Sequence, residues 1–420
     1  MRLSADRQTA ARQLMRVEDG AFSSRLSAGG TVPAARVRVL EVLRWQRAID
    51  SVLQPRCRRE LAQLDPEVRA SLRIGLVEAM RLGLPPALAT DGAVHLVRRL
   101  GKSSAAGMVN AVLRKAAAEW REVLEASSID VRLAHPWWLH NRWVENFGSE
   151  SAASAMASAQ EQPVTWVWFF YEDVASTGAR EGVDLEAHPW CSGAWSAPDH
   201  APRLVQSVKE GAAYAQDPSS QLVAHVAKNL ARDGDRFLDL CAAPGGKSAL
   251  MLRLGRWGIA AAADLRPARV GLMRPTLARA GECLVAVADV MQPPFAAGIW
   301  DLVLLDAPCT GTGTFRRHPE LKWRLSPDSV GEMAEKQKQL LASSLELVAP
   351  GGILLYSTCS VEPEENEGVV SVLPSGFELE DLESVMPDNV PWISTDAAGA
   401  RILPNPNGDG FTIHAIRRTA

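Results

Sequence analysis

The fold is decided by RFLDLCAAPGGKS, residues 236–248. The first five residues include Phe237, Leu238 and Leu240 and are bounded by turn residues, which predicts a strand. The small residues that follow predict a glycine-rich turn whose backbone can approach a ligand closely, and a helix begins at its end. Downstream, β-type runs alternate with helical ones at short spacing. This alternation predicts an α/β fold with a doubly wound sheet.

The α/β pattern starts near Gln216. The predicted helices span 218–231, 267–280 and 328–348, and the predicted strands span 236–240, 259–263, 284–288, 302–306 and 353–357. Ligands of such sheets bind outside the carboxyl ends of the strands. Five residues lie at or just after such ends and are therefore candidate site residues: Cys241, Asp264, Asp289, Cys309 and Cys359.

The glycine-rich turn does not match a phosphate-binding loop. In the pattern G-x-x-x-x-G-K-[ST], Gly246 and Lys247 fit, but the first glycine would fall on Cys241. Pro244 has no N–H with which to hold a phosphate. A dinucleotide-binding G-x-G-x-x-G does not fit the turn either. These mismatches argue against a polyphosphate ligand.

Asp264 and Asp289 end the second and third strands. A carboxylate at the first point can accept hydrogen bonds from both hydroxyls of a ribose, and one at the second can accept from an adenine amine. Each Asp could instead cap a turn or helix, since Asp264 stands just before the helix at Pro267. Taken with the turn, the two acids indicate an adenosine-bearing cofactor without a polyphosphate. S-adenosylmethionine fits that description.

Two strands end in a cysteine segment, LLDAPC at 304–309 and LYSTC at 355–359. Methyl transfer to C5 of a pyrimidine requires a thiolate that adds at C6, because C5 is otherwise a weak nucleophile. An acid at the ring N3 helps that addition, and a second group helps the thiolate to leave. Cys309, Cys359 and Asp306 supply these three groups. The residues alone do not decide which cysteine attacks.

The composition is that of an ordinary globular protein, with 420 residues, 47% hydrophobic and 22% charged. This length predicts two or three domains. The first residues lack the apolar core of a signal peptide, and no run approaches the ~18 apolar residues that span a membrane, so we expect a cytoplasmic protein without a membrane partner. The six cysteines form no C-x-x-C pair and no cluster with histidine. We therefore expect neither a metal site nor a disulfide framework.

Charge is distributed unevenly along the chain. Residues 1–125 carry 21 Lys and Arg against 13 Asp and Glu, a net +8, whereas the rest carries 24 against 36, a net −12. The first segment also has helical periodicity interrupted by Pro and Gly, which predicts a small helical bundle. An Arg-rich bundle is explained equally by a polyanion partner and by a solvated helical surface. Charge alone does not decide between these two explanations.

The chain resembles the RNA cytosine-C5 methyltransferases of the Nop/Sun family. The segments that carry the resemblance are Gln216–Gln221, Cys241–Lys247, Asp306–Gly313, Arg316–Trp323, Ser357–Ser360, Glu364–Glu367 and Asp409–Phe411. The resemblance implies a NusB-like helical RNA-binding domain at 1–127, a small α+β connector at 128–212 and a Rossmann-like class I methyltransferase domain at 213–420. The whole arrangement is similar to bacterial members that act on ribosomal RNA.

The resemblance also implies roles. Cys359 would be the nucleophile, Cys309 would promote product release, and Asp306 would contact the base. The residues implied for S-adenosylmethionine are Cys241, Ala242, Ala243, Pro244, Gly245, Gly246, Lys247, Asp264, Asp289 and Asp306. The expected activity is methylation of C5 of a cytosine in 16S ribosomal RNA by a monomer. The same chemistry on transfer RNA and a non-catalytic RNA-binding assembly factor are the alternatives.

Two further segments carry charge near the predicted site. Arg316, Arg317, His318 and Lys322 follow Cys309, and such a loop is suited to contact RNA phosphates beside an extruded base. The acidic segment 362–367 fits a helix N-terminus, where negative charge is favourable.

Overall fold

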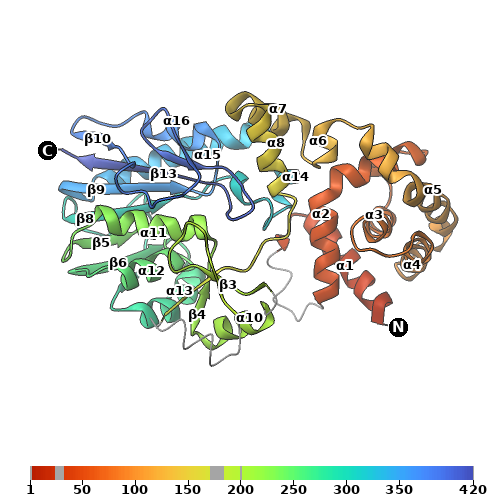
Figure 1. Ribbon diagram of the computed structural model, residues 1–420, viewed down its shortest axis with the longest axis horizontal. Coiled ribbons are helices and arrows are strands. Elements are labelled where there is room, and N and C mark those ends of the chain that lie inside the picture. Colours follow the sequence, from red (N-terminus) through yellow and green to blue (C-terminus); the bar gives the residue numbers. More distant parts are fainter. Residues whose placement is uncertain (1, 24–32, 171–183, 199–200, 420) are drawn as a thin grey trace. The chain divides into compact units, whose positions relative to one another are not determined.

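Two units divide the chain in the computed structural model, which describes residues 2–23, 33–170, 184–198 and 201–419. The first unit combines Met1–Glu161 with Phe315–Arg324, and the second combines Gln162–Thr314 with Leu325–Ala420. Figure 1 shows the helical first unit and the second unit built on a sheet. The division into three domains at residues 127 and 212 stays a prediction, and residues 171–183 and 199–200 of the connector lie outside the described residues.

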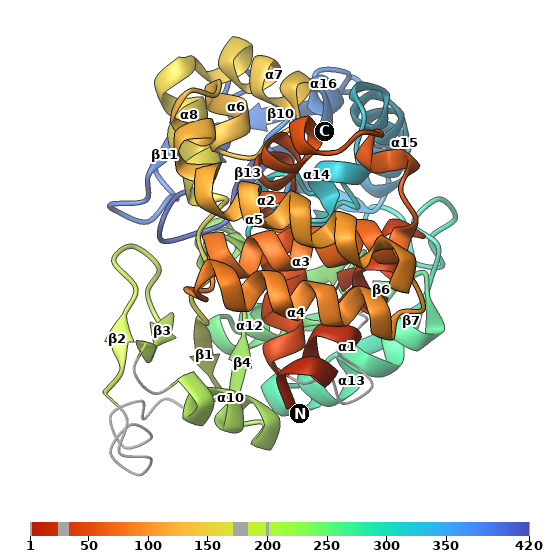
Figure 2. The ribbon, with the colours of Figure 1, turned by 90° about the vertical axis from the view of Figure 1, so that its right-hand side faces the viewer.

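The described residues of the first unit form helices and no strand, and the helical bundle predicted for residues 1–125 lies within it. Proline begins three of its described helices, at Pro33, Pro66 and Pro86, where the fixed φ and the missing N–H cost nothing. The helices are α1 (Arg2–Glu18), α2 (Pro33–Leu53), α3 (Pro66–Met80), α4 (Pro86–Arg99), α5 (Ala106–Glu125), α6 (Ile129–Arg132), α7 (Trp137–Phe147) and α8 (Ser149–Ser158). Figure 2 looks onto the group formed by α1 to α5.

Helix α3 is the centre of this bundle, with apolar residues buried on every side. It also carries a buried carboxylate, Glu78, which accepts hydrogen bonds from Nε of Arg7 on α1 (2.9 Å) and Nε of Arg38 on α2 (2.6 Å). The Glu78 side chain is fully buried, and both arginines are nearly so. Three helices are therefore joined by one desolvated ion-pair cluster as well as by apolar packing.

The segment Phe315–Arg324 belongs to the helical unit although it follows Thr314 of the other unit in sequence. Nζ of Lys322 donates to the carbonyl oxygens of Arg44 (2.8 Å) and Ala134 (2.9 Å), and Nε1 of Trp323 donates to that of Leu43 (2.7 Å). The segment contains the short helix α14 (Leu321–Arg324). It therefore completes the core of the helical unit.

This placement corrects the expectation that the charged loop after Cys309 contacts RNA through all of its cations. Arg316 is 3% exposed and Lys322 is 1% exposed, so neither side chain can reach a phosphate. The sequence shows their charge but not the distant helices that cover them. Arg317 and His318 are partly exposed, and the expectation stands for them as a prediction.

The second unit contains the predicted α/β sheet. Strands β5 (Arg236–Asp239), β6 (Ile259–Asp264), β7 (Leu284–Val287), β8 (Trp300–Asp306) and β9 (Val348–Thr358) run parallel in the order β7-β6-β5-β8-β9. From β5 the chain first adds strands on one side of the sheet (β6, β7) and then on the other (β8, β9). Such sheets bind ligands at the point between β5 and β8 where this direction changes. The predicted fold class is confirmed.

Successive residues of the strands point to opposite faces of the sheet, so each face carries its own apolar layer. Phe237, Leu302 and Leu355 pack in one buried cluster with α11 (Pro218–Leu230), α12 (Gly246–Leu254) and α13 (Pro267–Ala280). Their neighbours Leu238, Val303 and Tyr356 pack in another cluster with α15 (Pro327–Leu345) and α16 (Glu367–Val370). The helices on the two faces of the sheet can be followed in Figure 1. Burial on both faces explains why these strands are continuously apolar.

The sequence did not predict the antiparallel side of the sheet. Strand β13 (Phe411–Arg418) pairs with β9, with Thr412 opposite Thr358, and β10 (Phe377–Glu380), β11 (Trp392–Ser394) and β12 (Ala400–Ile402) extend that side. This register brings the Asp409–Phe411 segment beside the carboxyl end of β9. Strands β10, β11 and β12 have only three or four residues each, too few for their periodicity to stand out.

A separate small sheet precedes the large one in the same unit. Its strands are β2 (Glu186–Ala187), β3 (Trp195–Ser196), β1 (Val167–Phe169) and β4 (Ala213–Ala215), with α10 (Ala201–Glu210) before β4. Across the described residues of both units, no helix is both long and apolar enough to span a bilayer.

Candidate active site

Cys309 and Cys359 meet at the ends of two neighbouring strands. Their Sγ atoms are 3.3 Å apart, and neither cysteine forms a disulfide. The parallel register places Asp306 opposite Ser357. Cys309 comes three residues after Asp306 and Cys359 two residues after Ser357, so both cysteines lie just beyond this pair. Both side chains are partly buried. The structure thus brings together the two thiols that the sequence singles out.

The surroundings of Cys309 keep its thiol protonated. The hydrogen bond with Cys359, burial, and the negative charges nearby, including that of Glu365, raise the pKa of Cys309 well above its ordinary value. Cys309 therefore remains a neutral thiol at physiological pH. A neutral thiol is a hydrogen-bond donor, so it can interact favourably with a thiolate beside it.

Asp306, at the end of β8, is held by two donors. Nζ of Lys247 lies 2.8 Å from one carboxylate oxygen, and Oγ of Ser357 donates to the other at 3.0 Å. Burial by itself would lower the pKa of Lys247, but the carboxylate of Asp306 raises it. The same Nζ lies 5.1 Å from the ring centre of Phe411, at the start of β13. The ammonium and carboxylate are thus fixed close to the cysteine pair.

The glycine turn forms a hollow of about 150 Å³. Gly245 has a φ of +103°, and a Cβ there would lie 2.9 Å from Cβ of Met273. A Cβ on Gly246 would lie 2.5 Å from the Tyr214 ring. Both positions therefore require glycine. The residues lining the hollow are Tyr214, Ala215, Gln216, Ser220, Asp239, Cys241, Ala242, Ala243, Pro244, Gly246, Lys247 and Asp306.

Asp264 and Asp289 do not line this hollow. Asp264 is buried and accepts from the N–H of Arg266 at 3.0 Å, which is the turn-capping contact that the sequence left open. Arg269 pairs with Asp264 (3.3 Å) and also donates to the carbonyl oxygen of Ala243 in the glycine turn. Asp289 is exposed and accepts from the N–H of Met291 at 2.9 Å. Arg269 was not identified from the sequence.

Sequence reasoning also missed side chains beside the hollow. Nε2 of Gln216 donates to Ser220 (3.0 Å) while its Oε1 accepts from Nε1 of Trp168 (2.8 Å), so the amide orientation is fixed. The motif Gln216–Gln221 contributes to the family resemblance, but the sequence assigns it no role. Asp239 is only a strand residue in the sequence, yet burial raises its pKa to about 7. No sequence signal points to Tyr214, because only the tertiary fold places it against Gly246.

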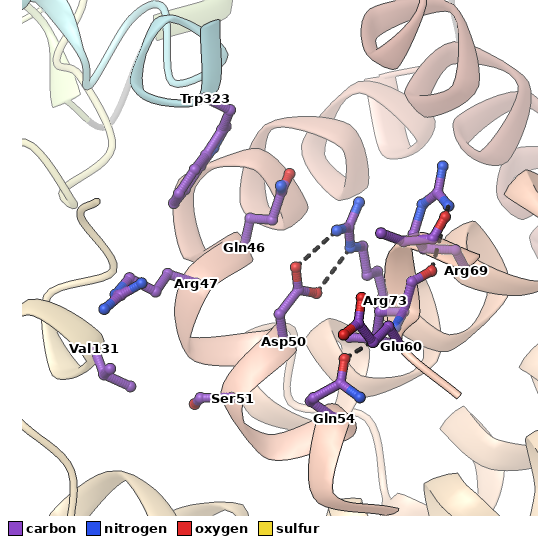
Figure 3. A pocket seen from close by; sticks show the side chains of 12 residues that line it. Gln46, Arg47, Asp50, Ser51, Gln54, Glu60, Arg69, Arg73, Val131 and Trp323 are labelled. Carbon is purple, nitrogen blue, oxygen red and sulfur yellow. Dashed lines mark hydrogen bonds and ion pairs between the residues drawn. The ribbon is translucent and has the colours of Figure 1, made fainter. Parts of the chain in front are cut away.

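Two hollows among the described residues of the helical unit differ in their charge balance. The larger, about 850 Å³, contains Arg47, Arg69 and Arg73 (Figure 3). Each of these arginines has a carboxylate partner: Arg73 pairs with Asp50 and Glu18, Arg69 with Glu18, and Arg47 with Asp130. Figure 3 shows the Arg73–Asp50 pair spanning part of the hollow. Little positive charge is left there to attract a polyanion.

The second hollow, about 660 Å³, has an apolar floor that includes Met108 and Val112. Arg58, Arg59 and Lys115 line it, and all three are exposed. Among the residues that the structure describes, none of these three cations has an ion-pair partner. This hollow combines uncompensated positive charge with apolar surface, and positive charge of this kind attracts the phosphates of a nucleic acid.

Comparison with known proteins finds relatives in sequence and in structure. Residues 209–417 match the family model described as 16S rRNA methyltransferase RsmB/F, and residues 4–118 match that of the NusB family. The ribosomal RNA small subunit methyltransferase B of Thermus thermophilus is 35% identical over 90% of this chain and 87% of its own. That of Sodalis glossinidius is 31% identical over 89% and 86%, respectively.

Solved structures show the same fold. The crystal structure of PH0851 superposes with a TM-score of 0.75 at 23% identity and covers 98% of both chains. A methyltransferase homologue from Pyrococcus horikoshii has a TM-score of 0.57 at 25% identity, covering 69% of this chain and 97% of its own.

Proposed function

Because the chain belongs to the RsmB/F family of 16S rRNA methyltransferases and carries a NusB-family helical domain, we propose that it methylates C5 of a cytosine in 16S ribosomal RNA. The coarser statement, an S-adenosylmethionine-dependent ribosomal RNA methyltransferase, follows from the family. The choice of cytosine C5 is supported by one observation, the pair of thiols 3.3 Å apart beside Asp306. Methylation of a base nitrogen or of a ribose would need no thiol.

The proposed reaction begins at Cys359. Its thiolate adds to C6 of the cytosine, and N3 takes up a proton that is held between N3 and the carboxylate of Asp306, so that C5 becomes the nucleophilic carbon of an enamine. Ser357 and Lys247 hold the carboxylate of Asp306 in one orientation for that contact. Once C5 carries the new methyl group, its proton leaves to a base. The C6–S bond then breaks, and the sulfur keeps the bonding electron pair.

Cys309 assists this last step in the proposal. It is a neutral thiol within hydrogen-bond distance of the Cys359 sulfur, so it can stabilise that sulfur as the departing thiolate. The assignment of Cys359 as the nucleophile and Cys309 as the releasing group is the one that the family resemblance implies.

The residues present fit S-adenosylmethionine, which when bound supplies the methyl group. The glycine positions leave backbone accessible at the hollow, and its volume of about 150 Å³ suits one end of such a ligand. Residues Cys241–Lys247 would hold that end. Asp264 and Asp289, at the ends of β6 and β7, would take the nucleoside end beyond the hollow.

The RNA would also bind the helical unit. Arg58, Arg59 and Lys115 supply charge that no carboxylate of the described residues neutralises, and this favours the polyanion explanation of the Arg-rich bundle. An RNA substrate is consistent with a cytoplasmic location.

The decisive experiment incubates the purified full chain with S-adenosylmethionine and unmethylated 16S ribosomal RNA, and maps 5-methylcytosine by bisulfite sequencing. One converted cytosine in 16S RNA, lost in Cys359→Ala, is the expected result. Methylation of transfer RNA instead would replace the substrate assignment. Absence of 5-methylcytosine from both RNAs would reject the cytosine-C5 chemistry.

A further inference from the structure

A buried carboxylate connects the two cysteine loops. Glu365 is 0% exposed and stands in the short helical turn that follows β9. Its carboxylate accepts hydrogen bonds from the backbone N–H of Thr310 (2.8 Å) and from the hydroxyls of Thr310 and Ser360. Thr310 follows Cys309, and Ser360 follows Cys359. One side chain therefore holds the residue next to each thiol.

Gln337, on α15, extends this contact to the other side of Cys309. Its Nε2 donates to Glu365 (3.0 Å) and to the carbonyl oxygen of Pro308 (2.9 Å). Both peptide neighbours of Cys309 are thus held by the Glu365–Gln337 pair. The loop cannot shift without breaking several buried hydrogen bonds, each costly to leave unmade.

Glu365 is itself fixed to the sheet. The hydroxyl of Tyr356, on β9, donates to the Glu365 carbonyl oxygen at 2.6 Å. The adjacent Asn366 accepts from Oγ1 of Thr358 (2.8 Å) and donates to the carbonyl oxygen of Ser360 (3.1 Å). The carboxylate therefore transmits the rigid geometry of β9 to the cysteine loops.

Burial raises the pKa of Glu365, and the hydrogen bonds from Ser360, Thr310 and Gln337 oppose that rise. All of these partners are donors, which match an ionised carboxylate. Helix capping, the role that the sequence suggests for this acidic segment, does not account for a side chain turned inward: α16 begins only at Glu367.

We propose that Glu365 is a positioning residue that sets the separation of the Cys309 and Cys359 thiols without contacting the substrate. This inference rests on the proposed function and assigns the residue that makes the two-cysteine site possible. Its effect falls on the chemical steps, because the hollow at the glycine turn contains neither Glu365 nor its partners.

The test compares Glu365→Gln and Glu365→Ala with the control Glu364→Gln, which alters the exposed neighbouring carboxylate. We expect single-turnover methyl transfer to fall about 100-fold in Glu365→Ala and less in Glu365→Gln, with the KM values for RNA and cofactor within twofold of wild type. The control should match wild type. Full activity, or a loss expressed only in KM, would overturn the proposal.

A second measurement does not depend on methylation. Phenylarsine oxide captures two close thiols, forming two As–S bonds and releasing one water, and mass spectrometry detects the product. Wild type should be captured across Cys309 and Cys359 at least about fivefold faster than Glu365→Ala. Equal capture contradicts the positioning role whether or not the chain methylates cytosine. If Glu365→Ala does not fold, Thr310→Val, which removes one hydroxyl, should show smaller losses in both measurements.

Discussion

The Sγ atoms of Cys309 and Cys359 lie 3.3 Å apart although 50 residues separate them in sequence. The parallel pairing of β8 with β9 brings their loops together, and Gly313 allows the first loop to pass against Gly410, whose carbonyl oxygen would lie 2.2 Å from a Cβ at that position. The N–H of Gly313 also donates to the carbonyl oxygen of Cys359 at 3.0 Å. Two thiols at this distance can act on the same carbon atom pair of one base.

Replacing each cysteine should block a different step of the reaction. Cys359→Ala should reduce methyl transfer by at least about 1,000-fold, because no other group adds to C6. Cys309→Ala should form the covalent RNA adduct and release it slowly, giving a band of increased mass on a denaturing gel. The double replacement should form no adduct. An adduct in Cys359→Ala, or none in Cys309→Ala, would contradict the assigned roles.

The open basic hollow should contribute to RNA binding and not to chemistry. Replacing Arg58, Arg59 and Lys115 together with Gln should raise the KM for RNA about tenfold or more and leave kcat unchanged. The dependence of log affinity on log salt should become less steep by about 2, since each lost phosphate contact contributes about 0.7 to 0.9.

The control for that experiment replaces Arg12, Arg16 and Arg98 with Gln. These are exposed residues of the same unit that do not line the hollow, so the net charge changes equally. An equal rise in KM in both triple variants would show that only total charge matters.

The buried ion-pair cluster of the helical unit should be important for stability. Glu78→Gln leaves Arg7 and Arg38 buried without a carboxylate and should lower the free energy of unfolding by about 3 kcal/mol. Glu119→Gln breaks an exposed pair with Arg56 and should cost less than about 1 kcal/mol. Urea unfolding of the full chain measures both, and equal effects would contradict the contrast between buried and exposed pairs.

Asp239 should make stability depend on pH. Burial raises its pKa to about 7 in the folded protein, against about 4 in an unfolded chain. The folded state therefore binds the extra proton between these values, so this stabilisation is complete below about pH 4 and is lost as the pH rises to about 7. Asp239→Asn removes this dependence. Melting temperatures between pH 4.5 and 8 should increasingly favour the variant as pH rises; a constant difference would refute the expectation.

Much of the fold was predictable because it rests on local patterns. The helix at Pro267–Ala280 has the predicted bounds, since proline starts it and Gly281 follows it. The parallel strands also lie where apolar runs predict them, although β9 begins at Val348, five residues before its predicted start at 353. The antiparallel strand β13 was missed, because its pairing with β9 is a contact between distant segments.

The candidate site divides in the same way. Residue types in sequence identified Cys309, Cys359, Asp306 and the glycine turn, because chemistry requires particular functional groups. The burial of individual charged side chains could not be predicted from the sequence, and this burial changes the roles expected for several of them. From the sequence, Lys322 was expected to contact a phosphate, but it is enclosed by the helical unit. Glu365 was expected at a helix N-terminus, but it lies between the cysteine loops.

The sequence by itself determined the alternation of parallel strands with helices, the Gly245–Gly246 turn and the presence of two cysteines at strand ends, since these depend on local periodicity and side-chain chemistry. Only the tertiary structure decided that the thiols face each other, that Lys247 pairs with Asp306, and which cations are neutralised. These relationships depend on distance and desolvation, and both arise only when segments far apart in the chain pack together.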